Sequence, residues 1–229
     1  NNYNANDYAS YNASGGTGTA AAGPNSNIPD GKIAAGQGFF VEGLSSGTVT
    51  FNNSIRLAGN NSMFFRSSTQ SLEKHRVWLN VINNLGAFKQ MLVGYIEGAT
   101  NDRDTRFDGE FVEAGNAVGL YSVLNQDKLT IQGRALPFAD TDEVPLGFKT
   151  TTAGTFEIQL ANFDGLFEQG QAIYLEDKLL NVIHDLRESN YSFTTTAGTF
   201  EERFELQFQN GTLSVPTFNE EGVVVYKNN

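Results

Sequence analysis

The sequence predicts an all-β fold, in the form of an antiparallel β-sandwich of the jelly-roll type with about 10–13 strands. Short runs of apolar residues with a period of two recur along the chain, and pairs of turn-forming residues separate them. The length of 229 residues suits a single all-β unit, and 12% aromatic residues supply a core that a disordered chain lacks. A single short helix is expected, over residues 68–76.

The expected strands differ in how many of their faces are apolar. Residues 77–82, 91–97 and 129–131 carry apolar side chains on both faces. Residues 156–160 and 204–208 alternate Phe, Ile or Leu with Glu or Gln, which is typical of antiparallel sheets that have one solvated face. Turn-forming pairs fall between such runs, at Asp30-Gly31, Asp108-Gly109, Asp164-Gly165 and Asn210-Gly211.

The first 31 residues differ in composition from the rest of the chain. They are rich in Asn, Gly and Ala, contain seven Asn, and include Tyr3, Tyr8 and Tyr11 at intervals. We therefore expect residues 1–31 to form a long extended segment packed on the body of the protein. Residues 32–229 are expected to form that body as one β-sandwich module, with 32–148 and 149–229 as two sub-halves.

One internal repeat is present. Residues 150–157, with the sequence TTTAGTFE, recur as residues 194–201, 44 positions later. Two copies are too few for a solenoid, which needs at least three repeats. The repeat therefore predicts a pseudo-symmetric pair of strands, each entered through an Ala-Gly corner, within one sandwich.

Charge and cysteine content exclude several functions. Fifteen Lys and Arg against 26 Asp and Glu give a net charge of −11, and this excludes binding to nucleic acid phosphates. The absence of cysteine excludes disulfides, zinc fingers, iron–sulfur clusters and thiol catalysis. No run of 18 apolar residues predicts a transmembrane helix.

Several blocks, in order along nearly the whole chain, carry a resemblance to a known kind of module. They are IAAGQGFFV at 33–41, HRVWLN at 75–80, LVGY at 92–95, YLEDK at 174–178 and TAGTF at 196–200. Together they resemble the C-terminal extracellular module that precedes the type IX secretion sorting domain in surface proteins of Bacteroidota, flavobacteria included. The resemblance implies a non-enzymatic cargo protein, secreted and attached to the cell surface. It also implies a structural spacer or adhesion unit, with the outer-membrane translocon and its shuttle proteins as partners during export.

The most polar loop of the chain predicts a candidate calcium site. Asp102, Asp104 and Asp108 lie in one short loop, and calcium takes six to eight oxygen ligands. The spacing is not that of an EF-hand. Arg103 and Arg106 supply the alternative, in which two salt bridges neutralise the same carboxylates without a metal. Calcium is thus the single candidate cofactor.

Aromatic side chains suggest an alternative function, that of a carbohydrate-binding module in a polysaccharide-acting protein or an adhesin. Flat rings stack on sugar faces. Tyr8, Tyr11 and Tyr95 are the candidate ligand-binding residues, and Tyr3 and Tyr121 are further candidates. A glycan is the corresponding partner. The competing explanation is that aromatic residues this frequent fill the core of the sandwich.

No set of residues predicts catalysis, and we expect a protein that is not an enzyme. Residues 43–47 match the G-x-S-x-G elbow, but that motif works at a strand-to-helix turn, and TVTF at 48–51 alternates as a strand. His75 and His184 lie in apolar runs without metal-binding spacing, so structural roles are favoured. A hydrolase would need two carboxyl groups about 5–10 Å apart across a cleft.

Overall fold

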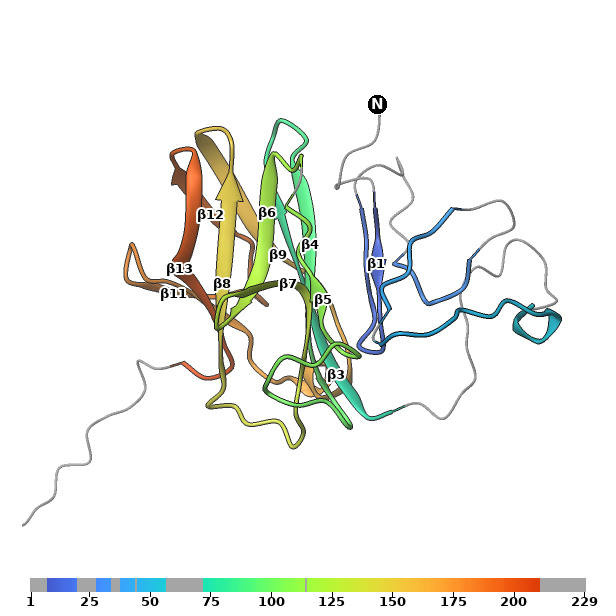
Figure 1. Cartoon of the computed structure of the whole chain (residues 1–229). Helices are drawn as coiled ribbons and strands as arrows, with labels where there is room; N and C mark the ends of the chain where they lie inside the picture. Colours follow the sequence, from blue (N-terminus) through green and yellow to red (C-terminus); the bar gives the residue numbers. More distant parts are fainter. Residues whose placement is uncertain are drawn as a thin grey trace, which may run out of the picture.

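The computed structural model describes residues 8–19, 28–33, 38–43, 45–56, 72–113 and 115–210. Within these residues the chain forms thirteen strands and two short 3-10 helices, so the predicted all-β, sandwich-like fold is confirmed (Figure 1). The strands are β1 Ser10–Tyr11, β2 Gly16–Thr17, β3 Lys74–Ile82, β4 Phe88–Ile96, β5 Gly109–Glu110, β6 Val118–Leu124, β7 Asp127–Arg134, β8 Glu143–Thr150, β9 Gly154–Phe163, β10 Tyr174–Asp177, β11 Val182–Asp185, β12 Tyr191–Thr195 and β13 Gly198–Gln207.

The helix expected over residues 68–76 is wrong in its described part, because β3 begins at Lys74. Residues Lys74 to Arg76 pair with Ile96 to Gly94 on β4, and this ladder outweighs the local helical preference of Lys and Arg. The 3-10 helices lie elsewhere, at η3 Asn53–Ile55 and η4 Gly165–Gln169. In the described part of the chain, no helix is long and apolar enough to cross a membrane.

One large sheet carries eleven of the strands. Its order is β11-β10-β13-β8-β6-β7-β4-β3-β9-β12, with β5 paired to β7 beside this path. Neighbouring strands of this sheet pair antiparallel, except for β4 with β7, which are parallel. The sheet rolls up so far that it is nearly a barrel. Tyr191 on β12, at one end of the path, donates a hydrogen bond to Asp177 on β10, near the other end.

The rolled sheet encloses one main core. Side chains from opposite walls meet there, and the ring of Phe148 on β8 lies within 5.1–6.3 Å of the rings of Phe156, Phe193 and Phe204. Edge-to-face aromatic pairs of this kind add to the free energy gained from burying their area. The two halves of the sheet thus share a single core.

The TTTAGTFE repeat forms two equivalent corners. The first copy joins β8 to β9 and the second joins β12 to β13. Thr150 at the end of β8 pairs with Gly198 at the start of β13, and Thr195 at the end of β12 pairs with Gly154 at the start of β9. Both glycines have a φ of 157°. The chain therefore crosses between the walls of the rolled sheet twice, by the same device.

The outer face of the sheet positions the candidate site. On β3, Val77, Leu79 and Val81 point into the core, because alternate residues of a strand face opposite sides. Trp78 lies on the other face with Leu92 and Ile131 and forms a smaller buried cluster there. Residues 8–19 cover this outer cluster; we call them the N-terminal hairpin, since β1 and β2 pair antiparallel within them.

Candidate functional site

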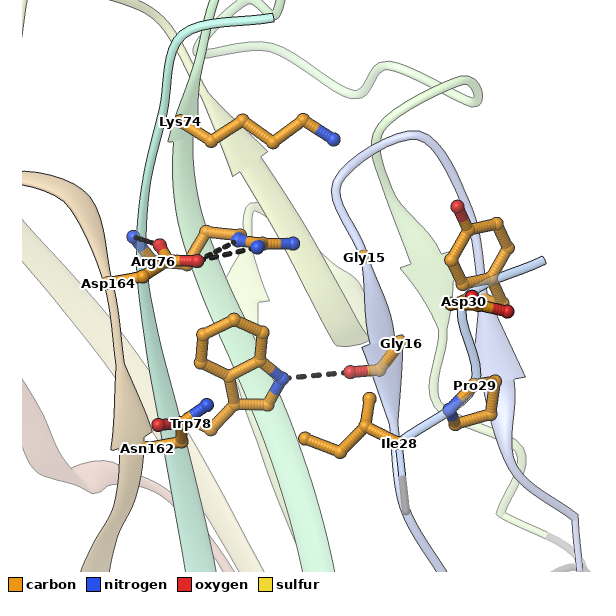
Figure 2. A pocket seen from close by; sticks show the side chains of 11 residues that line it. Gly15, Gly16, Ile28, Pro29, Asp30, Lys74, Arg76, Trp78, Asn162 and Asp164 are labelled. Atoms are coloured by element: carbon orange, nitrogen blue, oxygen red, sulfur yellow. Dashed lines mark hydrogen bonds and ion pairs between the residues drawn. The ribbon is translucent and has the colours of Figure 1, made fainter. Parts of the chain in front are cut away.

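Three side chains on the outer face of β3 hold the N-terminal hairpin by its backbone. Lys74 Nζ donates to the carbonyl of Ala13 at 2.7 Å, and Arg76 Nη1 donates to that of Ser14 at 3.0 Å. The Trp78 indole N–H donates to the carbonyl of Gly16 at 2.8 Å (Figure 2). Residues two apart on a strand share a face, so these donors form a regular row. All three donors therefore bind backbone carbonyl groups of the hairpin, and none of them binds a hairpin side chain in this row.

Arg76 is fixed in this row by Asp164. Its Nε and Nη2 donate to Asp164 Oδ2 at 2.9 and 2.5 Å, and its backbone N–H donates to Oδ1 at 2.9 Å (Figure 2). The guanidinium also lies 4.8 Å from the centre of the Trp78 ring. Such a bidentate, stacked arginine is preorganised, and little side-chain freedom is lost when it binds a further acceptor.

Gly15 lets the hairpin backbone approach the sheet closely, and Gly16 lets residues 28–29 approach the hairpin. A Cβ on Gly15 would lie 2.7 Å from Arg76 Nη1, and one on Gly16 would lie 2.3 Å from the backbone oxygen of Pro29. Gly15 also has a φ of +150°, which other residues rarely adopt. Neither Gly15 nor Gly16 therefore has room for a larger side chain.

A cavity of about 380 Å³ lies between the hairpin, residues 28–30 and β3. Besides the row on β3, its walls include Tyr11, Ile28, Pro29, Asp30 and Asn162 (Figure 2). Such a wall combines aromatic and aliphatic surface with amide, carboxylate and ammonium groups. Small-molecule sites have volumes of about 300–1,000 Å³, and their walls are in general more apolar than this one.

Burial changes the ionisation of two groups at this cavity. Burial, with the negative charge of Asp30, raises the pKa of the Tyr11 hydroxyl, although Arg76 opposes this. Burial and the neighbouring Arg76 lower the pKa of Lys74, while Asp164 opposes that shift. Tyr11 is thus a neutral hydroxyl, able both to donate and to accept a hydrogen bond.

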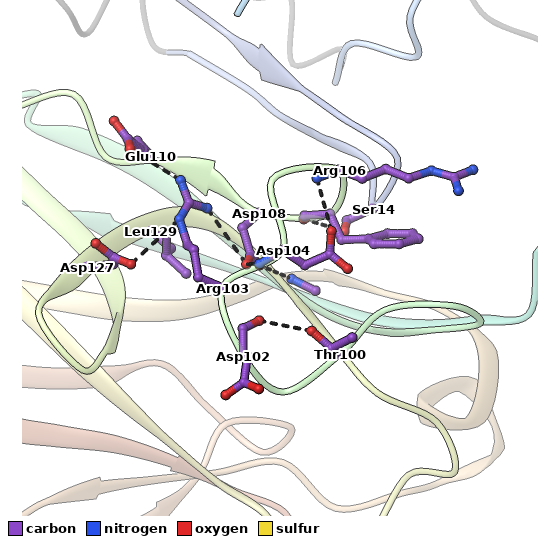
Figure 3. Close-up of polar contacts among 12 residues, drawn as sticks. Ser14, Thr100, Asp102, Arg103, Asp104, Arg106, Asp108, Glu110, Asp127 and Leu129 are labelled. Atoms are coloured by element: carbon purple, nitrogen blue, oxygen red, sulfur yellow. Dashed lines mark hydrogen bonds and ion pairs between the residues drawn. The ribbon is translucent and has the colours of Figure 1, made fainter. Parts of the chain in front are cut away.

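The polar loop that predicted calcium binding supports the other side of the hairpin. Ser14 Oγ donates to the carbonyl of Phe107 at 2.6 Å, and the N–H of Ala13 donates to the carbonyl of Arg106 at 3.2 Å. Asp108 holds this loop in shape. Its buried carboxylate accepts hydrogen bonds from the N–H of Asp104 at 2.6 Å and of Gly133 at 2.9 Å (Figure 3).

The three aspartates proposed as calcium ligands have different surroundings. Asp104 accepts from the N–H of Arg106, Asp108 is engaged as described above, and the carboxylate of Asp102 points away from both (Figure 3). Among the described residues, no group of three or more His, Cys, Asp or Glu is placed to hold a metal ion. Calcium binding at these residues stays a prediction for measurement.

Arg103 provides only part of the charge neutralisation that was the alternative to calcium, since Asp108 is the one aspartate of the three candidate ligands that it faces and Arg106 forms no ion pair among the described residues. Its guanidinium nitrogens lie 3.3 Å from Glu110, 3.6 Å from Asp127 and 3.7 Å from Asp108 (Figure 3). Burial raises the pKa of Asp108, and the hydrogen bonds from Asp104 and Gly133 and the charge of Arg103 oppose that rise. One arginine thus faces three carboxylates.

The tyrosines proposed as ligand-binding residues separate into two groups. Tyr8 and Tyr11 are each 50% exposed, and Tyr11 lines the cavity. Tyr95 is only 2% exposed, and its hydroxyl donates to Asp142 at 2.6 Å inside the core, so the expectation of an accessible ring there is wrong. Tyr121 is buried as well, and Tyr3 lies outside the described residues.

The residues that could have suggested catalysis have structural roles. His75 Nδ1 accepts from the N–H of Leu166 at 3.1 Å, and its Nε2 lies 3.0 Å from Glu73. His184 Nε2 lies 3.2 Å from Ser189 Oγ but 2.9 Å from the carbonyl of Ser189. A carbonyl oxygen only accepts, so this nitrogen carries a proton and is not free to activate the hydroxyl. Residues 48–51 form no strand.

Sequence reasoning missed the row of donors on β3. Lys74, Arg76 and Trp78 alternate with Val77 and Leu79, and that alternation was the available signal. The pattern of three donors is not evident from the sequence if Trp78 is treated as an apolar residue, because its indole N–H is then left out. Asp164 was read only as half of a turn pair, although it fixes Arg76.

Comparison with known proteins places the chain in a family without assigning it an activity. No curated protein matches the chain, and no solved structure matches it. A family described as a Domain of unknown function (DUF8693) matches residues 1–208, which includes the hairpin, the cavity and all thirteen strands. The chain belongs to this family, DUF8693.

Proposed function

We propose that this chain is a non-enzymatic structural or adhesion module of a secreted, cell-surface protein exported as type IX secretion cargo. The observation that carries the proposal is the closure of the rolled sheet around one core. A spacer must keep its shape, and this sheet is tied across its two ends. The blocks that carry the family resemblance supply its frame, since residues 75–80 lie in β3, 92–95 in β4 and 196–200 at the start of β13.

The tie across the sheet is a buried ionic network. Arg203 donates to both carboxylate oxygens of Asp177, at 2.7 and 3.1 Å, and Tyr191 donates to Asp177 at 2.9 Å. Burial alone would raise the pKa of Asp177, but the bonds from Arg203 and Tyr191 and the charge of Arg203 hold it below its usual value. Ionised Asp177 thus joins β10, β12 and β13.

Export can be tested directly. The parent protein is expressed in its host with and without a downstream sorting domain, and surface display of this module is measured by protease accessibility on intact cells. We expect display only with the sorting domain, and through the outer-membrane translocon. A module that reaches the surface equally well without that domain is not type IX cargo.

Carbohydrate binding is the second candidate, and the cavity beside the N-terminal hairpin favours it. A saccharide presents hydroxyl groups and apolar ring faces together. The half-exposed ring of Tyr11 offers a stacking surface, and Asn162 and Asp30 offer an amide and a carboxylate at the same opening. A monosaccharide or disaccharide unit suits a volume of about 380 Å³.

A matched pair of variants tests this candidate. Tyr8 and Tyr11 are equally exposed, but only Tyr11 lines the cavity. A glycan array followed by calorimetry identifies any ligand, and Tyr11→Ala should then weaken binding at least tenfold while Tyr8→Ala leaves it unchanged. Equal losses in both variants, or no glycan bound at millimolar concentration, would remove the carbohydrate proposal.

A further inference from the structure

Residues 38–51 expose a large apolar surface. Phe40 is 86% exposed, and Phe39, Val41, Val49 and Phe51 are each exposed by about half or more. With Tyr8, Ile33 and Ile55, which are also exposed, the apolar area is on the order of 800 Å², given that an aromatic side chain buries 150–250 Å². The largest patch on a typical monomer is about 300–600 Å², and one side of a standard protein interface is about 800 Å².

The backbone of the same residues is also without partners. In the described parts of 38–51, no N–H or C=O group takes part in a hydrogen bond, and no strand is formed. The side chains contact one another instead, as in the edge-to-face pair of Phe39 and Phe51, 6.0 Å apart. The described residues of this segment, 38–43 and 45–51, run as an open coil beside the body of the molecule (Figure 1).

These two properties together define the kind of partner. A lipid surface would accept the apolar side chains but would leave the backbone groups unsatisfied, and that is costly in hydrocarbon. The edge of a β-sheet supplies partners for the backbone groups and for the apolar side chains, because it offers a ladder of N–H and C=O groups flanked by side chains. Thr48 to Phe51 already alternate polar and apolar residues, as an added strand does.

The same chain presents such an edge on its other side. The path of the large sheet ends at β11, which pairs with β10 alone among the described strands. Next to that edge lies the second cluster of exposed apolar residues, Leu179, Leu180 and Val182. In Figure 1, β11 and residues 38–51 lie on opposite sides of the molecule, too far apart to meet within one copy.

We propose that this protein associates head to tail with a second copy of itself, residues 38–51 of one copy adding as a strand to the β11 edge of the next. The contact places few charges against one another, since Glu42 is the sole charged residue of 38–51. Each copy then has one unpaired segment and one short edge, at which the carbonyl of Asp185 already accepts from the N–H groups of Glu188 and Ser189. The association is therefore heterologous and repeats along a line.

Cysteine cross-linking tests this geometry, because the chain has no cysteine of its own. Val49→Cys and Val182→Cys are made separately and mixed under mild oxidation, at protein concentrations up to about 1 mM, where weak contacts are populated. The control mixes Val49→Cys with Leu85→Cys, which lies at an exposed turn between β3 and β4. Circular dichroism checks that each variant is folded.

We expect the 49–182 heterodimer to exceed the 49–85 heterodimer at least fivefold, with larger species when both cysteines are in one chain. Phe51→Asp should abolish the excess and leave sedimentation monomeric. Equal yields in the two mixtures would overturn the proposal. A preference of Val49→Cys for itself would show a symmetric contact instead, and a chain that stays monomeric throughout would indicate that some other protein covers the segment.

Discussion

Two segments that precede β3 meet the rolled sheet in opposite ways. The N-terminal hairpin, residues 8–19, consists largely of small residues. Its backbone forms hydrogen bonds with Lys74, Arg76, Trp78 and the Arg106 carbonyl, and the Ser14 hydroxyl donates to the Phe107 carbonyl. Residues 38–51 carry large apolar side chains and make no hydrogen bond in their described parts.

The difference shows what docking on this surface requires. The side chains on β3 bind carbonyl groups, so a segment must come close, and Gly15 permits this where Phe39 and Phe40 do not. The small side chains of the hairpin bury less apolar area, but they allow its backbone to form hydrogen bonds with β3. Residues 38–51 have the apolar area without such hydrogen bonds, and the proposed contact would supply a sheet edge for their backbone. Amide hydrogen exchange distinguishes the two states, with protection expected in the hairpin and none in the isolated monomer over 38–51.

The largest loss of stability is expected from breaking the buried ion pair that holds the rolled sheet under the hairpin. Arg203→Met leaves the buried carboxylate of Asp177 without its charge partner, and breaking a buried pair in this way costs about 3–5 kcal/mol. Urea unfolding gives the change. Protection of the hairpin should fall with the barrel, while exchange over 38–51 stays as it was. The double variant Asp177→Leu, Arg203→Met should recover part of the lost unfolding free energy. An unchanged urea midpoint in Arg203→Met would contradict a stabilising role for the Asp177–Arg203 pair.

Acid should act through the same network. Because the pKa of Asp177 is held below its usual 3.8, the folded state binds this proton less readily than the unfolded chain does. The stability that ionised Asp177 contributes is therefore complete above pH 4 and is lost as the pH falls through its lowered pKa. Unfolding free energies measured from pH 5 to pH 2 should fall more steeply in the wild type than in the Asp177→Leu, Arg203→Met variant. Parallel curves would show that other groups dominate.

A smaller loss is expected at the loop that supports the hairpin. Asp108→Ala removes the acceptor of two N–H groups, of which that of Asp104 is partly exposed and can bond to water while that of Gly133 is buried, so the loss should be about 1–3 kcal/mol. Asp102→Ala, in the same loop, should change stability by less than about 0.5 kcal/mol, as surface substitutions do. Urea midpoints of the two variants give the comparison, and equal losses would mean that Asp108 has no special role.

Adding one methyl group should separate the hairpin from the sheet. Gly15→Ala places a Cβ 2.7 Å from Arg76 Nη1 and 3.1 Å from Leu92 Cδ2, and overpacking of this kind costs about 1–3 kcal/mol. Gly38→Ala and Gly47→Ala meet open space and are the matched controls. Trp78 is the sole tryptophan and donates to the hairpin carbonyl of Gly16, so its fluorescence reports docking while circular dichroism shows that the sheet is folded. Its emission should shift to the red in Gly15→Ala and in neither control.

The smallest effect is expected from calcium. With Asp108 already accepting two backbone hydrogen bonds and facing Arg103, millimolar calcium or chelator should leave the thermal midpoint of the wild type within about 1 °C. Asp104→Ala serves as the control. A rise of several degrees with calcium in the wild type, absent in Asp104→Ala, would establish the metal site at Asp102, Asp104 and Asp108.

The sequence predicted the faces of the strands better than their partners. The runs at 156–160 and 204–208 fall in β9 and at the end of β13 with Phe156, Ile158, Phe204 and Leu206 inward, because a period of two depends on local residues alone. Pairing of β3 with β9, or of β4 with β7 in parallel, joins residues far apart in sequence, and periodicity contains no information on that.

The candidate site was harder to predict for a related reason. Tyr11 was singled out for its ring, and it does line the cavity. The row on β3, however, binds carbonyl groups, which every residue has, so no residue type in the hairpin marks the contact. For Asp108, the sequence shows a carboxylate in a polar loop, but its burial depends on the approach of Gly133 from β7.

The position of β13 determines how this module would respond to mechanical force. β13 lies between β8 and β10, so tension applied just after it, at Phe208, is shared by two ladders of hydrogen bonds at once. The N-terminal hairpin is held by single bonds to separate side chains, which can break one after another. Under tension between the two sides, the hairpin should therefore lengthen first and absorb the pull while the rolled sheet stays intact.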